Sequence, residues 1–116
     1  MALALPRLLR RLRPALAHFQ YALPLGYTGR SVVTIHDLSF EDDPSVMRRV
    51  DRYVFRRFVP RAARAAAHVL VVSERTRADV IRHYGVDPSR ITVTLNGVDA
   101  SFTPGGTVED YVLFVG

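Results

Sequence analysis

The sequence predicts an α/β protein in which helices flank a parallel sheet. Short apolar runs alternate along the chain with amphipathic helical patterns, as they do in parallel β/α units. Residues 68–72 are almost all apolar and β-branched, which is typical of a strand that helices cover on both faces. Ser73 and Gly85 then bracket a helical pattern, at positions that suit an N-cap and a left-handed C-cap.

Five strands and three helices are expected along the chain. The basic segment at residues 6–13 predicts the last turns of a helix, because Pro14 cannot continue it. In the long pattern at residues 46–67, apolar side chains recur at spacings of three and four. Pro60 interrupts this pattern, which predicts either a kink or two helices that meet there. The strands are expected at residues 15–19, 31–35, 68–72, 91–95 and 111–115, and the third helix at residues 74–84.

The composition excludes several classes of protein. With 116 residues and 48% hydrophobic content, the chain holds one globular domain at most and is not a disordered segment. It has no cysteine, which excludes disulfides, thiolate metal sites and a cysteine nucleophile. No apolar run reaches the roughly 20 residues that cross a membrane, and arginines interrupt the N-terminal segment where a signal peptide needs an apolar core. We therefore expect a cytoplasmic protein.

The net charge of +5 raises the question of a nucleic-acid partner. All 16 basic residues are arginine, and arginine without lysine beside abundant alanine is typical of a coding bias. Many of these arginines fall on helical patterns, where they form a solvated face. We therefore expect no nucleic-acid partner. A basic module that binds anionic lipid or nucleic acid through its arginine-rich helices stays open as an alternative.

The stretch VVTIHDLSF at residues 32–40 places a polar pair directly after an apolar strand. Open α/β sheets form their ligand crevices at the carboxyl ends of the strands, so His36 and Asp37 are candidates for a site. The alternative is that His36 only satisfies a backbone group of the loop. Metal-dependent phosphohydrolases also use a His-Asp pair, but on a helix and with further ligands. The other three histidines show no metal-ligand spacing, so we expect no metal site.

Three longer stretches follow one another in a particular order. They are VVTIHDLSF, then AAHVLVVSERTRADVIRHYGVDPSRITVTLNGVDASFTP, then YVLFVG. Their order and spacing resemble the retaining glycosyltransferases of family 4, in which a strand ends in a His-Asp or His-Glu pair and a later strand ends in a serine that opens a helix. The resemblance covers residues 15–116, and NGVDASFTP followed by YVLFVG is its most specific part.

The resemblance implies a Rossmann-like sheet within a GT-B fold, where two such domains face each other across a cleft. Residues 1–104 then correspond to part of the N-terminal, acceptor-side domain, and residues 105–116 to the first strand of the C-terminal, donor-binding domain. The family's first β–α units, and the basic pair and acidic motif that bind the donor, are not among these residues. We therefore expect a truncated enzyme that is inactive alone, with the missing domain portions as its partners.

The resemblance also implies roles for the polar pair. His36 becomes the catalytic candidate, which faces the cleft and hydrogen-bonds the donor sugar or the leaving group. Asp37 becomes a substrate-side residue that fixes the loop or the histidine tautomer rather than a base.

Four further residues acquire a candidate role from the resemblance. Ser73 caps its helix and also borders the acceptor, and a purely structural cap is the alternative. Asn96 and Gly97 line the cleft near the donor, although Asn96 alone can also tie down a turn. Gly116 begins the loop that binds the donor phosphates. By contrast, we expect Asp99 only to cap a turn.

The implied reaction is the transfer of a sugar from a nucleotide-sugar donor to an unknown acceptor, with retention and of the hexosyltransferase type. The donor is a substrate, and no other cofactor is expected. Two further possibilities stay open. The protein can contact the inner face of a membrane peripherally, and the chain can be a non-catalytic Rossmann-like fragment that binds a partner chain.

Overall fold

The computed structural model describes residues 4–103, 105, 106, 110, 112 and 114. Its centre is a four-stranded sheet in the order β1-β2-β3-β4, and all three neighbouring pairs are parallel. This sheet with its flanking helices confirms the predicted α/β, Rossmann-like fold. The strands are β1 (Ala17–Gln20), β2 (Ser31–Ile35), β3 (His68–Val71) and β4 (Ile91–Val93).

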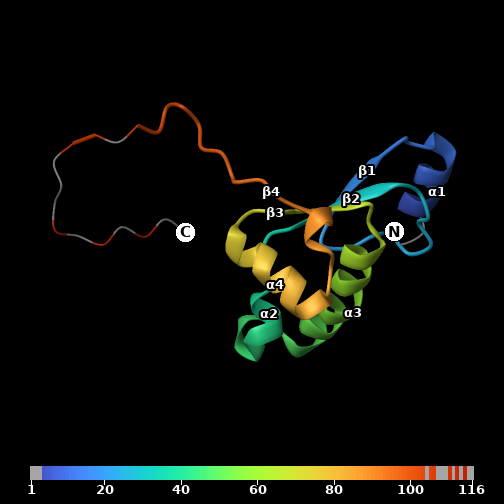
Figure 1. The fold of residues 1–116 in the computed structure, drawn as a ribbon, viewed down its shortest axis with the longest axis horizontal. Coiled ribbons are helices and arrows are strands. Elements are labelled where there is room, and N and C mark those ends of the chain that lie inside the picture. Colours follow the sequence, from blue (N-terminus) through green and yellow to red (C-terminus); the bar gives the residue numbers. More distant parts are fainter. Residues whose placement is uncertain (1–3, 104, 107–109, 111, 113, 115–116) are drawn as a thin grey trace.

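The core lies between one face of the sheet and a layer of three helices. These helices are α2 (Ser39–Asp42), α3 (Arg49–Ala65) and α4 (Glu74–Tyr84), and all three lie on the same side of the sheet (Figure 1). On that side the central strands contribute Val33, Ile35, Val69 and Val71, whose side chains are fully buried. A fourth helix, α1 (Ala4–Leu12), lies apart from this layer, where the chain enters β1 (Figure 1).

The opposite face of the sheet is less covered than we expected. Val32 and Leu70 on the central strands are only half-buried. Two histidines on this face bond to threonines across the strands: His18 Nε2 lies 2.7 Å from Thr34 Oγ1, and His68 Nε2 lies 2.8 Å from Thr92 Oγ1. Cover on both faces of β3 is therefore not found within the described part of the chain.

The long helical pattern forms one continuous helix, so of the two alternatives expected at Pro60, that of two separate helices is not observed. Pro60 lies inside α3, whose buried residues Val59, Ala62 and Ala63 flank it and keep the helix on the sheet. The helix also starts later than residue 46. Asp43 accepts a hydrogen bond from the Ser45 backbone N–H and caps a separate 3-10 turn, η1 (Pro44–Val46).

A short helix that the sequence pattern did not predict, α2, is held between α3 and α4 by a buried carboxylate. The Glu41 side chain is 7% exposed; it accepts a hydrogen bond from the Tyr84 hydroxyl at 3.0 Å and lies 2.8 Å from Arg56 Nε. Burial, and then the Glu41 charge, raise the pKa of Tyr84, so its hydroxyl stays a donor. Because α2 directly follows residues 36–38, this contact also fixes the loop after β2.

The last part of the chain is only partly described. The strand expected at residues 111–115 falls largely on residues outside the description, as does Gly116. The domain division after residue 104 therefore stays a prediction. Among the described residues, no helix has the length and the apolar character that a membrane crossing requires.

Candidate functional site

The carboxyl ends of three parallel strands meet at one edge of the sheet, and each supplies polar groups there. β1 ends at Gln20 and is followed by Tyr21, β2 leads into His36, and β3 leads into Ser73. The His36 ring is half-buried, with Nε2 3.1 Å from Gln20 Oε1. Its centroid lies 5.6 Å from that of Tyr21. The imidazole is thus oriented by the neighbouring strand β1.

Asp37 holds the loop that follows His36. Its Oδ1 accepts hydrogen bonds from the Ser39 hydroxyl at 2.6 Å and the Ser39 backbone N–H at 3.0 Å, and its Oδ2 accepts one from the Tyr21 hydroxyl at 3.1 Å. The Ser39 hydroxyl contributes most to lowering the pKa of Asp37, against an opposing effect of burial. A carboxylate with a lowered pKa is a weak base. No hydrogen bond described for Asp37 reaches the His36 ring, so its partners belong to the loop and to β1.

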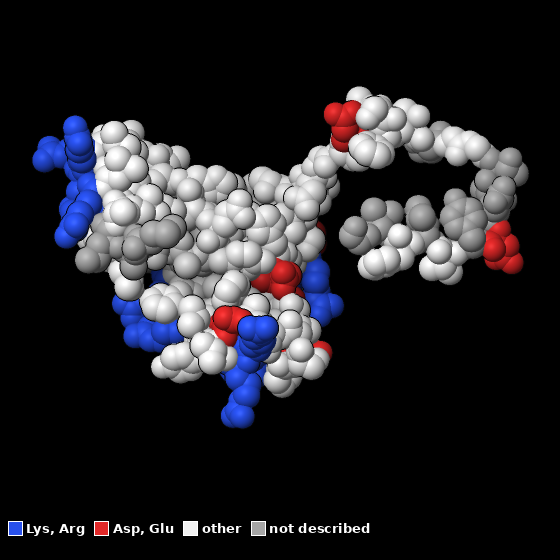
Figure 2. Space-filling view, turned by 180° about the vertical axis from the view of Figure 1, so that it is seen from behind, with Lys and Arg blue, Asp and Glu red and all other residues white. Residues whose placement is uncertain are grey.

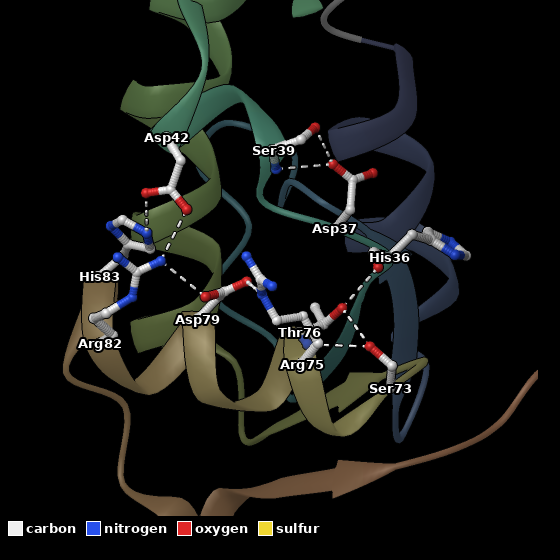
Figure 3. A network of polar contacts seen from close by, with 10 residues as sticks. All are labelled: His36, Asp37, Ser39, Asp42, Ser73, Arg75, Thr76, Asp79, Arg82 and His83. Atoms are coloured by element: carbon white, nitrogen blue, oxygen red, sulfur yellow. Dashed lines mark hydrogen bonds and ion pairs between the residues drawn. The ribbon is translucent and has the colours of Figure 1, made fainter.

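Thr76 connects the first turn of α4 to the backbone of His36. Ser73 is the N-cap that the sequence predicts: its Oγ accepts a hydrogen bond from the Thr76 backbone N–H at 3.1 Å. The Ser73 and Thr76 hydroxyls lie 3.0 Å apart, and the Thr76 hydroxyl donates to the His36 carbonyl oxygen at 3.0 Å (Figure 3). Thr76 is buried, at 4% exposure. Sequence reasoning missed it, although its place three residues after a capping serine was a usable signal.

The candidates on the connector after β4 are not part of this group. Asn96 and Gly97 are exposed, and no described hydrogen bond joins them to His36 or its neighbours. Asp99 caps a turn, as the sequence predicts, because its Oδ1 accepts a hydrogen bond from the Ser101 backbone N–H at 2.8 Å.

A second polar cluster joins α2 to α4. Arg82 Nη2 lies 2.8 Å from Asp42 Oδ2 and 2.9 Å from Asp79 Oδ1, and His83 Nε2 lies 3.2 Å from Asp42 Oδ1 (Figure 3). The Arg82 hydrogen bond lowers the pKa of Asp42. Burial raises the pKa of Asp79, but the hydrogen bonds and charges of Arg82 and Arg75 outweigh it, so the net shift is downward.

This cluster contains three groups that are capable of holding a metal ion. Ligand atoms of Asp42, Asp79 and His83 lie within 4.8 Å of one another. The spacing of the histidines along the sequence did not indicate that His83 lies close to two carboxylates. However, the Arg82 guanidinium lies between the two carboxylates, and Arg75 Nε pairs with Asp79 at 3.1 Å. The carboxylates are therefore already neutralised, and we assign the cluster to the packing of α2 on α4.

A cavity of about 350 Å³ lies between the residues around His36 and the cluster that joins α2 to α4. Its lining includes Asp37 and Ser39 from the loop after β2, and Arg75, Thr76 and Asp79 from the first turns of α4. It offers hydroxyl, carboxylate and guanidinium groups next to the end of β2, which suits a ligand rich in hydroxyl groups.

A comparison with known families identifies the family to which this fold belongs. The model of Glycosyltransferase Family 4 matches residues 1–102. The chain belongs to Glycosyltransferase Family 4. The matched segment of this glycosyltransferase contains His36 and every group that contacts it. No curated protein matches the chain significantly.

The lowered pKa of Asp37 makes a prediction about acid stability. A carboxylate whose pKa is lower in the folded state stabilises the fold above its ordinary pKa of 3.8, and this contribution is lost as the pH falls through the folded value. Asp37→Asn should therefore lower the free energy of unfolding of this glycosyltransferase chain near neutral pH. The difference from wild type should shrink below about pH 4. Urea unfolding of both proteins from about pH 3 to pH 7 measures this difference in free energy. A difference that does not change with pH would contradict a lowered pKa for Asp37 in the folded state.

Proposed function

We propose that the chain forms the acceptor-side part of a retaining glycosyltransferase that takes a sugar from a nucleotide-sugar donor. Family membership supports the glycosyltransferase activity. The observation that carries the finer proposal is His36, whose ring and backbone are both fixed at the carboxyl edge of a Rossmann-like sheet. Such edges are where open α/β sheets bind their ligands.

The proposed role of His36 follows from its two ring nitrogens. The Gln20 amide carries both a donor and an acceptor, so it can fix Nε2 in either neutral tautomer. No described hydrogen bond involves Nδ1, which is left for the substrate. In retaining transfer, the bond between the sugar carbon and the phosphate oxygen breaks, and negative charge develops on the leaving diphosphate. With Gln20 Oε1 accepting from Nε2, a neutral ring has an unprotonated Nδ1, which positions a sugar hydroxyl by accepting its hydrogen bond. With the Gln20 amide turned so that its N–H faces Nε2, Nδ1 instead carries the N–H that stabilises the developing charge, without acting as a nucleophile.

The remaining candidate residues are assigned to supporting roles in the proposal. Asp37 holds the loop on which His36 lies, and its lowered pKa makes it unsuited to removing a proton. The cavity beside Asp37 and Thr76 is the proposed entry for the acceptor. Ser73 caps the turn that carries Thr76 and is proposed to lie near the acceptor, and Asn96 and Gly97 are proposed donor contacts on the connector. Gly116 remains the proposed start of the phosphate-binding loop.

The reaction is proposed to take place in the cytoplasm. The 116 residues contain no cysteine, which is consistent with a reducing compartment, where disulfides do not contribute to stability.

A test of the catalytic role requires a family member that contains both domains and the same TIHD stretch. Changing the histidine at the position of His36 to alanine should lower turnover by about 10²–10³-fold, because one oriented donor to the developing charge is lost. Thermal stability should change little, since His36 is half-exposed and the Thr76 bond to its carbonyl remains. Steady-state kinetics and thermal unfolding measure the two effects. An unchanged turnover would assign His36 to a purely structural role.

The 116-residue chain alone should neither transfer sugar nor bind a nucleotide sugar tightly. A diphosphate requires cationic groups that converge on one point. Three arginines of α3 instead hydrogen-bond or pair with the protein itself: Arg52 with the Phe40 carbonyl, Arg56 with Glu41, and Arg64 with the Tyr84 carbonyl. Calorimetric titration with several nucleotide sugars should give no binding in the micromolar range. Micromolar binding would show that the donor site lies within these residues.

A further inference from the structure

Tyr21, the residue that follows β1, has an unusual backbone conformation. Its φ is 58°, in the left-handed region that a residue with a bulky side chain rarely adopts. The Ala22 backbone N–H bonds to the Gln20 carbonyl at 2.6 Å, so the chain turns within three residues around Tyr21. A three-residue turn with a positive φ at its centre is the rare, strained form. Glycine adopts this φ freely, so the contacts of Tyr21 itself hold the strained turn in place.

These contacts join the end of β1 to three other parts of the domain. The Tyr21 backbone N–H bonds to the Thr34 carbonyl at 2.9 Å, which extends the pairing of β1 with β2. The Tyr21 ring packs against the hydrophobic core, and its centroid lies 5.4 Å from that of Phe55 in α3. The Tyr21 hydroxyl donates to Asp37 Oδ2 at 3.1 Å and accepts a hydrogen bond from the Asp37 backbone N–H at 3.3 Å. The turn is therefore tied to the sheet, to α3 and to the loop that follows β2.

The hydroxyl of Tyr21 keeps its proton beside the carboxylate of Asp37. Burial, and then the charge of Asp37, raise the pKa of Tyr21. The Ser39 hydroxyl contributes most to lowering the pKa of Asp37, and the Tyr21 hydroxyl adds to this effect. Near neutral pH the two side chains are thus a neutral donor and an ionised acceptor, and the bond between them persists.

Gln20 and Tyr21 both lie against the ring of His36. Side chains of neighbouring residues in a regular strand point to opposite faces of the sheet. The left-handed backbone at Tyr21 departs from that geometry. The Gln20 amide lies 3.1 Å from His36 Nε2, and the Tyr21 ring centroid lies 5.6 Å from that of the imidazole. Two consecutive side chains therefore contact one imidazole.

No charged group of the sheet takes part in orienting this imidazole. The four described strands contain no charged residue. Blue side chains gather at the α1 end and over the lower helices, and the upper middle of the molecule, where Figure 1 places the strands, is white (Figure 2). None of the ion pairs found among the described residues involves His36. Its ring is held by the neutral side chains of Gln20 and Tyr21.

We infer that Tyr21 is a positioning residue for the transfer reaction, whose strained backbone and aromatic ring hold the His36 imidazole against Gln20. The inference rests on the proposed role of His36 in transfer. Tyr21 acts through His36 and is assigned no contact with the substrate. The alternative is that Tyr21 only packs against Phe55, a role that requires neither the strained φ nor the contact with the imidazole.

NMR of the ring nitrogens in the 116-residue chain tests the positioning without a transfer assay. In a neutral histidine that is held in one tautomer, only one ring nitrogen carries a proton, so the nitrogen-15 shifts of Nδ1 and Nε2 differ widely. Wild-type His36 should show this pattern at about pH 8.5, where histidine rings are neutral. Tyr21→Leu should reduce the difference between the two shifts, because a ring that turns away from Gln20 loses the bond that selects its tautomer. Tyr21→Phe keeps the aromatic ring and should keep the difference.

The matched control is Tyr27→Leu. The Tyr27 ring packs edge-on against Phe19 at 5.3 Å, and no described contact joins it to His36. This variant should leave the His36 shifts as in wild type. If Tyr21→Leu does not fold by circular dichroism, Tyr21→Met gives the same test, because its flexible side chain fills the space against Phe55. An undiminished shift difference in the folded Tyr21 variant, or an equal loss in Tyr27→Leu, would overturn the inference.

Kinetics connect the positioning to the reaction. They require a two-domain family member with the TIHD stretch and a tyrosine at the position of Tyr21. There the change Tyr21→Leu should lower kcat by about 10²-fold, the loss that a misplacement of about 1 Å can cause, and leave the donor KM within about twofold. Tyr21→Phe should retain most of the wild-type kcat. In a His36→Ala background, Tyr21→Leu should lower kcat by less than about twofold, because residues that act as a unit are not additive.

The outcomes separate this inference from the proposed function. Losses that add when the His36 and Tyr21 changes are combined would overturn the positioning role alone. A higher KM with an unchanged kcat in Tyr21→Leu would do the same. An unchanged turnover in His36→Ala would overturn the proposed role of His36, and with it the role of Tyr21 in transfer.

Discussion

The hydrogen bond from the Thr76 hydroxyl to the His36 carbonyl oxygen is the contact on which the candidate site depends. It joins the first turn of α4 to the end of β2, across 40 positions of sequence. Ser73 caps the same turn, so the position of Thr76 is itself fixed by the end of β3. With its backbone held in this way, His36 directs its ring to Gln20 at the end of β1. Three parallel strands thus contribute to one site because their carboxyl ends lie at the same edge of the sheet.

Much of this arrangement was predictable from the sequence. The β-branched runs and the Ser73 and Gly85 caps predict the parallel sheet and α4, because these signals are local. The stretch VVTIHD places His36 at a strand end for the same reason. The bond from Thr76 and the pairing of Asp42 with Arg82 were not predictable, since each joins residues 40 positions apart. The four-residue helix α2 is too short to show a period, and Pro60 stays within α3 because the buried residues around it hold the helix on the sheet.

Ion pairs hold the layer of three helices together beside the site. Arg56 of α3 pairs with Glu41 of α2, and Arg82 of α4 pairs with Asp42 of α2 and with Asp79 of α4 itself. The short helix α2 is therefore fixed to both longer helices, and with it the loop that carries His36 and Asp37.

The central claim is that the Thr76 hydroxyl holds the end of β2, and Thr76→Val tests it most directly. The valine keeps the buried shape but removes the donor to the His36 carbonyl, so the free energy of unfolding should fall by about 1–3 kcal/mol. Amide hydrogen exchange should become faster at Asp37 and Ser39, which follow the released carbonyl. The control is Thr92→Val, because Thr92 also bonds to a histidine but is exposed. This variant should change the free energy of unfolding by less than about 0.5 kcal/mol. Equal stability of Thr76→Val and wild type, with unchanged exchange at residues 37–39, would contradict the claim.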